Sequence, residues 1–238
     1  MGYRYLFFDL DNTLWDFDAN AKYALQVLFE KYKLSSSYPD FDTYYRLYSE
    51  NNARLWRLYG AGKITKEALN EARFAYPLRA FDASLLPIAP LMQEDYLPLL
   101  ARQTRLKPYC IEVLDKLKTR RYKMYIISNG FVEIQQLKLQ RSGLLPYFER
   151  CYFSEHIGAH KPAKVFFDYA IKSSNALKKQ SLVIGDNFEA DIVGAKNAGI
   201  DQVYFNPNPS PEPLPFTPKF HIKNLRELLK ILDESFNR

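Results

Sequence analysis

Four short apolar runs are the feature of this sequence that most restricts its fold. They cover residues 5–9, 122–127, 181–184 and 202–205, and amphipathic helical patterns separate the last three. Nearly continuous apolar runs of this length are typical of strands buried on both faces, and strands that alternate with helices pair in parallel. The sequence therefore predicts an α/β fold, with a Rossmann-like parallel sheet core and helices on both faces.

Polar residues stand where the first three runs end. Asp9 closes the first run, Ser128 and Asn129 follow the second, and Asp186 comes shortly after the third. The carboxyl ends of parallel strands meet at one edge of an open sheet, and ligands bind there. We therefore expect these side chains to lie close together in space.

Two helix ends are also marked. Gly199 follows a helical pattern over residues 189–198 and suits a helix C-terminus. Asn224 and Glu227 have the spacing of a capping box, which predicts the start of the C-terminal helix.

The chain between residues 16 and 105 follows a different pattern. It holds long amphipathic stretches rich in Tyr, Leu and Ala, and no clear strand. We interpret residues 16–105 as an inserted all-α domain, and residues 1–15 with 106–238 as the α/β core. Breaks between the inserted helices are expected near Pro39, Gly60, Gly62, Pro77 and Pro87.

Composition excludes several classes of protein. With 47% hydrophobic and 25% charged residues, the chain has the make-up of an ordinary globular protein. The net charge of +6 comes from scattered Lys and Arg residues rather than one tract, so nucleic acid is not the expected partner. Cys110 and Cys151 form neither a disulfide framework nor a zinc motif, which fits a cytoplasmic location. No apolar run approaches the ~18 residues of a membrane span.

Two aspartates at the first strand end suggest paired chemistry. Asp9 and Asp11 lie two positions apart, and Thr13 follows at the same interval. Side chains at alternate positions of an extended segment point the same way, so one carboxylate can attack while its neighbour transfers protons. A turn with acidic capping residues has the same pattern, and this motif by itself leaves both interpretations open.

Three further motifs supply groups that suit a phosphate and a metal ion. The Ser128 hydroxyl can bind a phosphate oxygen, Lys161 in the sequence HKP offers a positive charge, and the carboxylates of Asp186 and Asp191 suit Mg²⁺. Each also has an ordinary alternative: a strand-to-turn sequence, a surface lysine, or acidic residues at a helix start.

Together and in this order, the four motifs resemble those of the haloacid dehalogenase superfamily of hydrolases. The resemblance spans residues 7–199 and puts the helical insert at the position of that family's small cap domain. Many members have a second proline three positions after the motif lysine, where this chain has Lys164, and this departure concerns the geometry of that loop.

The resemblance implies a mechanism. Asp9 would attack phosphorus and form an aspartyl-phosphate, and Asp11 would protonate the leaving oxygen before activating water. Relatives that cleave carbon–halogen bonds lack this second acid, so Asp11 favours phosphate chemistry.

The resemblance also implies a Mg²⁺ site. Asp9, the backbone carbonyl of Asp11 and Asp186 would hold the ion, while Asp191 would arrange bound water or Lys161. Ser128 and Lys161 would bind the phosphoryl oxygens. Thr13 and Asn129 are supporting residues in the same motifs.

The insert suggests a substrate class. Residues 51–65, with the sequences DNTLWDFD and SNGF in the core, resemble the bacterial pyrimidine 5′-nucleotidase branch of the superfamily. That branch implies a nucleoside monophosphate as the small phosphorylated partner. Aromatic residues at helical spacing often pack against neighbouring side chains, so Trp56 and Tyr59 could serve either packing or substrate contact. The candidates are Phe17, Asn51, Arg54, Trp56, Tyr59, Lys63 and Arg73.

Two alternatives remain beside the nucleotidase. One is a sugar-phosphate or phosphoglycolate phosphatase with the same core, and the other is a non-catalytic binding protein on the same fold. The proline-rich residues 207–218 favour an extended surface connector, with a recognition motif as the alternative. The sequence does not predict an oligomeric state.

Overall fold

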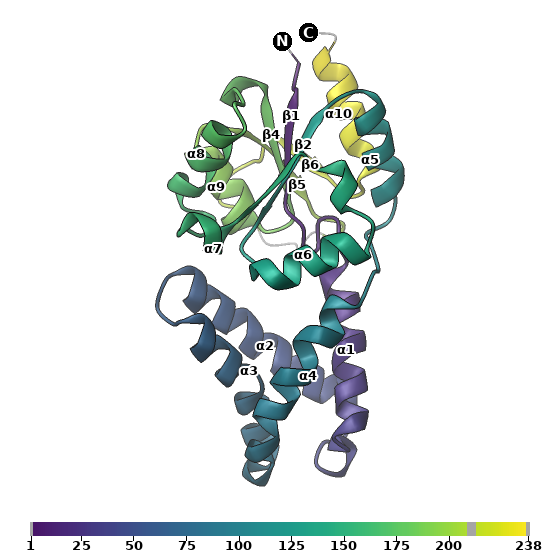
Figure 1. Cartoon of the computed structure of the whole chain (residues 1–238), viewed down its shortest axis with the longest axis vertical. Helices are drawn as coiled ribbons and strands as arrows, with labels where there is room; N and C mark the ends of the chain where they lie inside the picture. Colours follow the sequence, from purple (N-terminus) through teal and green to yellow (C-terminus); the bar gives the residue numbers. More distant parts are fainter. Residues whose placement is uncertain (1, 209–212, 237–238) are drawn as a thin grey trace. The chain divides into compact units, whose positions relative to one another are not determined.

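The computed structural model describes residues 2–208 and 213–236. The chain divides into two compact units, one formed by Met1–Phe17 with Thr104–Arg238 and the other by Asp18–Gln103. The first unit is α/β and the second is helical (Figure 1). No helix in the described part is both long and apolar enough to cross a membrane.

The α/β unit is built on one parallel sheet. Its strands in the described residues lie in the order β3-β2-β1-β4-β5-β6, and every pair is parallel (Figure 1). The predicted α/β fold is therefore confirmed. The strands are β1 (Tyr5–Phe8), β2 (Lys123–Ser128), β3 (Arg150–Phe153), β4 (Ser181–Gly185), β5 (Asp201–Phe205) and β6 (Phe220–Ile222).

The two edge strands, β3 and β6, were not expected from the sequence. They have four and three residues, and each begins with a residue that is not buried. Runs this short give little hydrophobic periodicity to detect. They form strands because they pair with their neighbours, β3 with β2 and β6 with β5.

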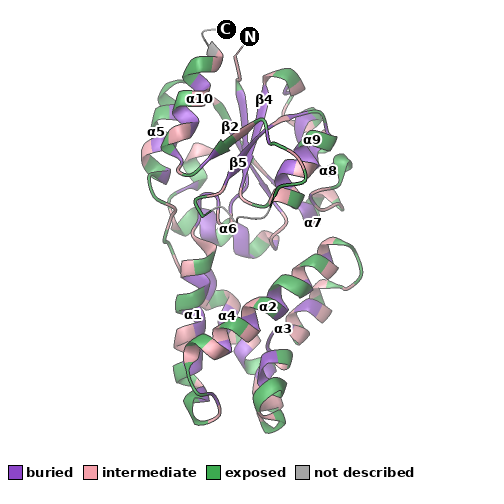
Figure 2. Cartoon of the chain, turned by 180° about the vertical axis from the view of Figure 1, so that it is seen from behind, coloured by how far each residue is buried: buried purple, intermediate pink, exposed green. Residues whose placement is uncertain are grey.

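Helices cover both faces of the sheet. In Figure 1, α8 (Lys164–Ser173) and α9 (Gly194–Asn197) lie on one side, and α5 (Cys110–Thr119) and α10 (Arg226–Phe236) lie on the other. Phe7 and Val183 from the strands pack with Phe166 and Phe167 of α8 in one buried cluster. The central strands β1, β2, β4 and β5 are mostly coloured as buried in Figure 2, so their carboxyl ends are set by a packed core. The remaining helices of this unit are α6 (Val132–Arg141) and α7 (Ser154–Ile157).

The marked helix ends largely agree with the structure. Gly199 has φ 72°, the left-handed conformation that suits glycine after a helix. The Glu227 carboxylate accepts the Asn224 backbone N–H at 3.1 Å, which is one half of a capping box.

The helix expected over residues 189–198 needs correction, because a π-helical turn, Phe188–Val193, precedes α9. Asn187 caps this turn, since its side chain accepts the Ala190 N–H at 2.9 Å. The Asp191 carboxylate in turn accepts the Asn187 N–H at 3.1 Å. Asp191 therefore lies within the wider turn, and π-turns are often found at functional sites.

The insert contains the helices α1 (Phe17–Lys31, whose first residue belongs to the α/β unit), α2 (Phe41–Gly60), α3 (Lys66–Phe81) and α4 (Ala89–Ala101). The break expected near Pro77 is wrong, because α3 continues through it. A proline cannot donate to the carbonyl four residues earlier, here that of Arg73. The Asn51 side-chain amide donates to that carbonyl at 3.1 Å instead, so the helix tolerates its proline.

The proline-rich segment falls partly outside the described residues, which omit 209–212. In the described portion the Phe216 ring lies 5.0 Å from Phe188, and the Lys196 ammonium lies 3.5 Å from the centre of the same ring. The segment runs between β5 and β6.

Candidate active site

Three adjacent strands bring the motif residues to one edge of the sheet. β1 lies between β2 and β4, and Asp9, Ser128 and Asp186 stand at or just beyond their carboxyl ends. The Asp9 backbone N–H donates to the Ile184 carbonyl at 2.9 Å, so Asp9 continues the pairing of β1 with β4. The Thr13 hydroxyl lies 3.2 Å from carboxylate oxygens of both Asp9 and Asp186.

Lys161 places a buried positive charge beside Asp9. Its ammonium donates to Asp9 Oδ1 at 2.7 Å, to Asp191 Oδ1 at 2.6 Å and to the Ile127 carbonyl at 3.1 Å. Its side chain is 3% exposed. Burial by itself would lower the pKa of Lys161, but the carboxylates of Asp191 and Asp9 raise it above the ordinary value. Lys161 is therefore a fixed positive charge beside Asp9.

Three carboxylates next to Lys161 form a donor set that fits a divalent cation. One oxygen from each of Asp9, Asp186 and Asp191 lies within 4.8 Å of the others. Burial, together with the charges of Asp191 and Asp11, raises the pKa of Asp9 to about 7 against the pull of Lys161. Burial and the carboxylates of Asp9 and Asp191 raise the pKa of Asp186 well above its usual range. Excess negative charge in a desolvated cluster of oxygen ligands suits a hard cation such as Mg²⁺.

The Asp11 carboxylate does not join this cluster. It accepts hydrogen bonds from Lys138 at 2.7 Å and from Gln135 at 2.8 Å, both on α6. The family resemblance implies that Asp11 binds metal through its backbone carbonyl. Its side chain instead binds Lys138 and Gln135.

Gly185 makes room for Asp191. A Cβ atom at Gly185 would lie 2.3 Å from Asp191 Oδ2, which is far closer than real contacts allow. Because the last residue of β4 has no side chain, the fully buried Asp191 carboxylate reaches the strand end and Lys161.

Ser128 and Asn129 follow β2 with different partners. The Ser128 hydroxyl accepts the Gly130 N–H at 3.1 Å and a Gln135 amide N–H at 2.7 Å. The Asn129 side chain binds the backbone of Lys161 through two hydrogen bonds and so anchors the loop that carries the lysine.

Sequence reasoning missed Gln135 and Lys138. They lie on α6 beside the buried Ile134 and Leu139, and their own exposed fractions are 1% and 2%. The sequence did hold a signal for them, because both are polar residues on the apolar side of an amphipathic helix. Such groups must find a hydrogen-bond partner inside the protein.

The candidate substrate residues fall into both structural units. Phe17 belongs to the α/β unit, where its ring lies 6.3 Å from that of Trp15. The other six belong to the insert. Asn51 and Arg73 are buried there: Asn51 binds carbonyls of α3, and Arg73 lies 3.3 Å from the Gln93 amide oxygen and beneath the Tyr96 ring.

The remaining four insert residues are more varied. Arg54 and Lys63 are exposed, and Arg54 donates to the Asn51 side-chain oxygen at 2.9 Å. The rings of Trp56 and Tyr59 contact each other edge to face, with 5.7 Å between centres.

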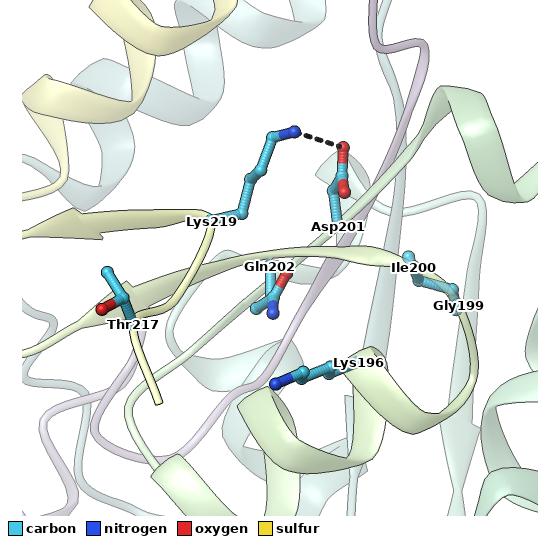
Figure 3. Close-up of a pocket in the computed structure, with 7 residues that line it drawn as sticks. All are labelled: Lys196, Gly199, Ile200, Asp201, Gln202, Thr217 and Lys219. Carbon is cyan, nitrogen blue, oxygen red and sulfur yellow. Dashed lines mark ion pairs between the residues drawn. The ribbon is translucent and has the colours of Figure 1, made fainter. Parts of the chain in front are cut away.

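A surface hollow of about 380 Å³ lies away from these motifs (Figure 3). Its lining residues precede or begin β5 and β6, which is the edge of the sheet opposite the carboxyl ends. Lys219 and Asp201 form an ion pair across it at 3.9 Å (Figure 3). None of the motif residues lines this hollow.

Comparison with known proteins shows which family the chain belongs to. The family model for haloacid dehalogenase-like hydrolases matches residues 3–199. The chain is 33% identical to pyrimidine 5′-nucleotidase PynA of Streptococcus pneumoniae, covering 99% of this chain and 97% of that protein. It is 32% identical to pyrimidine 5′-nucleotidase YjjG of Escherichia coli, covering 98% and 99%. The structure of HAD-hydrolase YfnB from Bacillus subtilis bound to magnesium superimposes with a TM-score of 0.86, at 30% identity over 98% of this chain and 100% of that one.

Fold, motif positions and similarity together define the class of the protein: the chain belongs to the haloacid dehalogenase-like hydrolases. The resemblance inferred from the four motifs is thereby confirmed. Within that family it is a phosphoric monoester hydrolase.

Proposed function

We propose that this chain is a Mg²⁺-dependent phosphomonoesterase that acts through an aspartyl-phosphate on Asp9, with pyrimidine nucleoside 5′-monophosphates as its substrates. The observation that carries the proposal is the setting of Asp9. Its carboxylate lies at the end of β1 between the Lys161 ammonium at 2.7 Å and the Thr13 hydroxyl at 3.2 Å, within the cluster of acidic oxygens.

In the first half-reaction Asp9 is the nucleophile. A carboxylate oxygen of Asp9 attacks phosphorus, the bond to the leaving oxygen breaks, and that oxygen keeps the electron pair. Asp11 gives its proton to the leaving oxygen, so the nucleoside departs as a neutral alcohol.

In the second half-reaction Asp11 acts as a base. It takes a proton from water while the water oxygen attacks phosphorus, and the bond between phosphorus and Asp9 breaks. Asp9 is restored as a carboxylate, phosphate leaves, and Asp11 again carries a proton.

Charge explains why the site needs more than a nucleophile. At an effective dielectric of ~20, each like-charge contact near 4 Å costs about 4 kcal/mol, which is roughly three powers of ten in rate. Lys161 offsets part of this repulsion next to Asp9. When bound by Asp9, Asp186 and the Asp11 backbone carbonyl, Mg²⁺ supplies positive charge for the phosphoryl oxygens. Ser128 and Lys161 bind these oxygens, and Asp191 holds Lys161 in place.

The nucleotide specificity rests on the insert. Two relatives that match almost the whole chain, insert included, are pyrimidine 5′-nucleotidases. We propose that residues 16–105 act as a cap that excludes water and selects the leaving group. Its candidate contacts are the exposed or half-buried Arg54, Trp56 and Lys63, together with Tyr59 and with Phe17.

A panel of phosphomonoesters tests this function. Phosphate release is measured for UMP, CMP and TMP, for AMP and GMP, and for sugar phosphates and phosphoglycolate, with Mg²⁺ and with excess chelator. We expect the highest kcat/KM for the pyrimidine nucleotides and loss of activity in chelator. A preference for sugar phosphates or phosphoglycolate would replace the nucleotide assignment and leave the phosphatase mechanism in place.

The nucleophile has its own control. Asp9→Asn should lower kcat by at least ~10⁴-fold, because a neutral amide neither attacks phosphorus nor forms an acyl phosphate. Asp233→Asn, at an exposed aspartate of α10, should retain full activity. Full activity in Asp9→Asn would disprove the mechanism. Absence of hydrolysis by the unaltered chain, with no binding of beryllofluoride and Mg²⁺, would favour a non-catalytic binding protein.

A further inference from the structure

Helix α6 directs two buried side chains at the carboxylate of Asp11. The Lys138 ammonium donates to Asp11 Oδ1 at 2.7 Å, and the Gln135 amide nitrogen donates to Oδ2 at 2.8 Å. Both side chains are nearly inaccessible, with exposed fractions of 2% and 1%. One helix therefore holds both oxygens of the carboxylate, although it lies more than 120 residues further along the chain.

The Lys138 ammonium is confined by two aromatic rings that follow Asp11 closely in the chain. It lies 4.3 Å from the centre of the Trp15 ring and 5.3 Å from that of Phe17. A cation against aromatic faces is stabilised most where water is excluded. A buried ammonium needs acceptors for its N–H groups, and Asp11 Oδ1 is one of them in the described structure. The orientation of Asp11 is thus set by a cation that has little freedom to move.

Gln135 joins Asp11 to a second residue of the proposed site. The same amide nitrogen lies 2.7 Å from Ser128 Oγ, so it bridges the two. This path depends on Gly130, where a Cβ atom would lie 2.5 Å from the Gln135 carboxamide. Glycine at this position leaves the space that the carboxamide occupies.

We propose that Lys138 and Gln135 are positioning residues that fix the Asp11 carboxylate for proton transfer to the leaving oxygen. The proposal rests on the proposed function, in which Asp11 is the general acid. A general acid works only within hydrogen-bond reach of the atom it protonates. Loss of either positioning residue therefore impairs proton delivery more than the attack of Asp9 on phosphorus.

Leaving groups of different basicity separate these two effects. The alkoxide released from UMP needs a proton as the bond breaks, whereas 4-nitrophenolate is a stable anion and leaves without one. A defect in proton delivery lowers kcat/KM for UMP selectively. A defect in folding, metal binding or phosphate binding lowers kcat/KM for both substrates alike.

The main experiment measures kcat/KM of Lys138→Met for UMP and for 4-nitrophenyl phosphate. Methionine keeps an apolar stem against Trp15 and removes the charge. We expect a loss of ~10–100-fold for UMP and a loss at least ~10 times smaller for the aryl ester. Lys116→Met, which removes an exposed lysine–carboxylate pair on α5, is the matched control and should change neither value.

Three further variants complete the test. Asp11→Asn should show the same selective loss of kcat/KM for UMP, and this loss should be larger than that of Lys138→Met. Lys138→Met should add little to the loss in the Asp11→Asn background, because the two residues act as a unit. Gln135→Leu removes the carboxamide and Gly130→Ala displaces it. Both variants should lower kcat/KM for both substrates, because Ser128 loses its Gln135 donor, and should lower it further for UMP, because Asp11 loses the same donor. They test the proposal even if Lys138→Met does not fold.

Equal losses for both substrates, no loss for either, or losses that add to that of Asp11→Asn would overturn the inference. Each of these results leaves the proposed function intact as long as the unaltered chain hydrolyses UMP with Mg²⁺ and Asp9→Asn does not. Failure of that last comparison would instead remove the proposed function.

Discussion

Asn129 and Lys161 are joined by a reciprocal pair of hydrogen bonds: the Asn129 side-chain amide donates to the Lys161 carbonyl at 2.9 Å, and its oxygen accepts the Lys161 N–H at 2.8 Å. The side chain therefore satisfies both backbone groups of a residue 32 positions away. This contact ties the loop after β2 to the loop before α8, and it determines where the Lys161 ammonium meets Asp9.

Replacement of Asn129 should affect both stability and rate. Asn129→Ala removes two hydrogen bonds, and we expect the free energy of unfolding to fall by about 1–3 kcal/mol. Because Lys161 loses its anchor, kcat should fall by ~10–100-fold. Asn129→Asp, which keeps the acceptor for the Lys161 N–H, should retain part of the anchoring. The control Asn224→Ala breaks a bond to Glu227 and should lower stability without changing kcat/KM. Unaltered kcat in Asn129→Ala would contradict the role of this contact.

A methyl group at Gly185 should disturb the acidic cluster. Gly185→Ala places a carbon 2.3 Å from Asp191 Oδ2, so the carboxylate must move and its contact with Lys161 is disturbed. We expect a stability loss of about 1–3 kcal/mol and a ~10–100-fold weaker affinity for Mg²⁺, measured by calorimetric titration. Gly60→Ala is the control, since a Cβ there meets no atom within 4 Å. Unchanged stability and Mg²⁺ affinity in Gly185→Ala would show that the site does not depend on this close approach.

The pKa of Asp9 predicts how the metal-free protein responds to pH. In the folded protein the pKa of Asp9 is raised to about 7, against an ordinary value of 3.8. Between these values the folded state keeps a proton that the unfolded chain has released. The contribution of Asp9 to the free energy of unfolding is therefore fully present below about pH 4 and is lost as the pH rises through about 7.

Denaturant unfolding in chelator over this window measures the effect, and Asp9→Asn should lack this part of the slope. Mg²⁺ binds the carboxylate form, so its stabilisation of the protein should be larger at about pH 8 than at about pH 6. A metal-free stability that rises through the window, relative to that of Asp9→Asn, would contradict the prediction.

The pairing of Asn51 with Pro77 predicts a coupled stability effect inside the insert. The Asn51 amide donates to the Arg73 carbonyl, which has no helical donor because Pro77 lacks an N–H. Asn51→Ala should lower the free energy of unfolding by about 1–3 kcal/mol. In a Pro77→Ala background the loss should be about 1 kcal/mol smaller, because the alanine backbone N–H restores the helical donor. A double-mutant cycle measures this coupling.

The same variant separates packing from substrate contact. If Asn51 serves the helix, the ratio of kcat/KM for UMP and AMP stays constant in Asn51→Ala. Additive losses in the cycle, together with a changed nucleotide ratio, would return Asn51 to the substrate site.

The central strands and the positions of the motif residues could be predicted from the sequence. β1, β2, β4 and β5 consist mostly of apolar residues, because both faces of the sheet are covered, and this leaves a local signal. Asp9, Ser128 and Asp186 stand at or just beyond the carboxyl ends of three such strands. Parallel pairing then brings them to one edge, so their meeting followed from the order of the strands.

The partners of buried polar groups could not be predicted in this way. Lys138 and Asp11 are 127 positions apart, and nothing local to either residue specifies the other. Asn51 has a polar side chain that could contact a substrate, but in the structure its amide donates to the Arg73 carbonyl of α3, which Pro77 leaves without a helical donor. The edge strands β3 and β6 depend in the same way on the strands beside them.

The sequence by itself thus determined the four central strands, their carboxyl ends and the residues that stand there, because hydrophobic burial and chain order act through local patterns. Tertiary structure alone decided which donor meets which acceptor: Lys161 with Asp191, Asn129 with the Lys161 backbone, and α6 with Asp11. A buried polar group must be satisfied, but packing between distant segments selects the group that satisfies it.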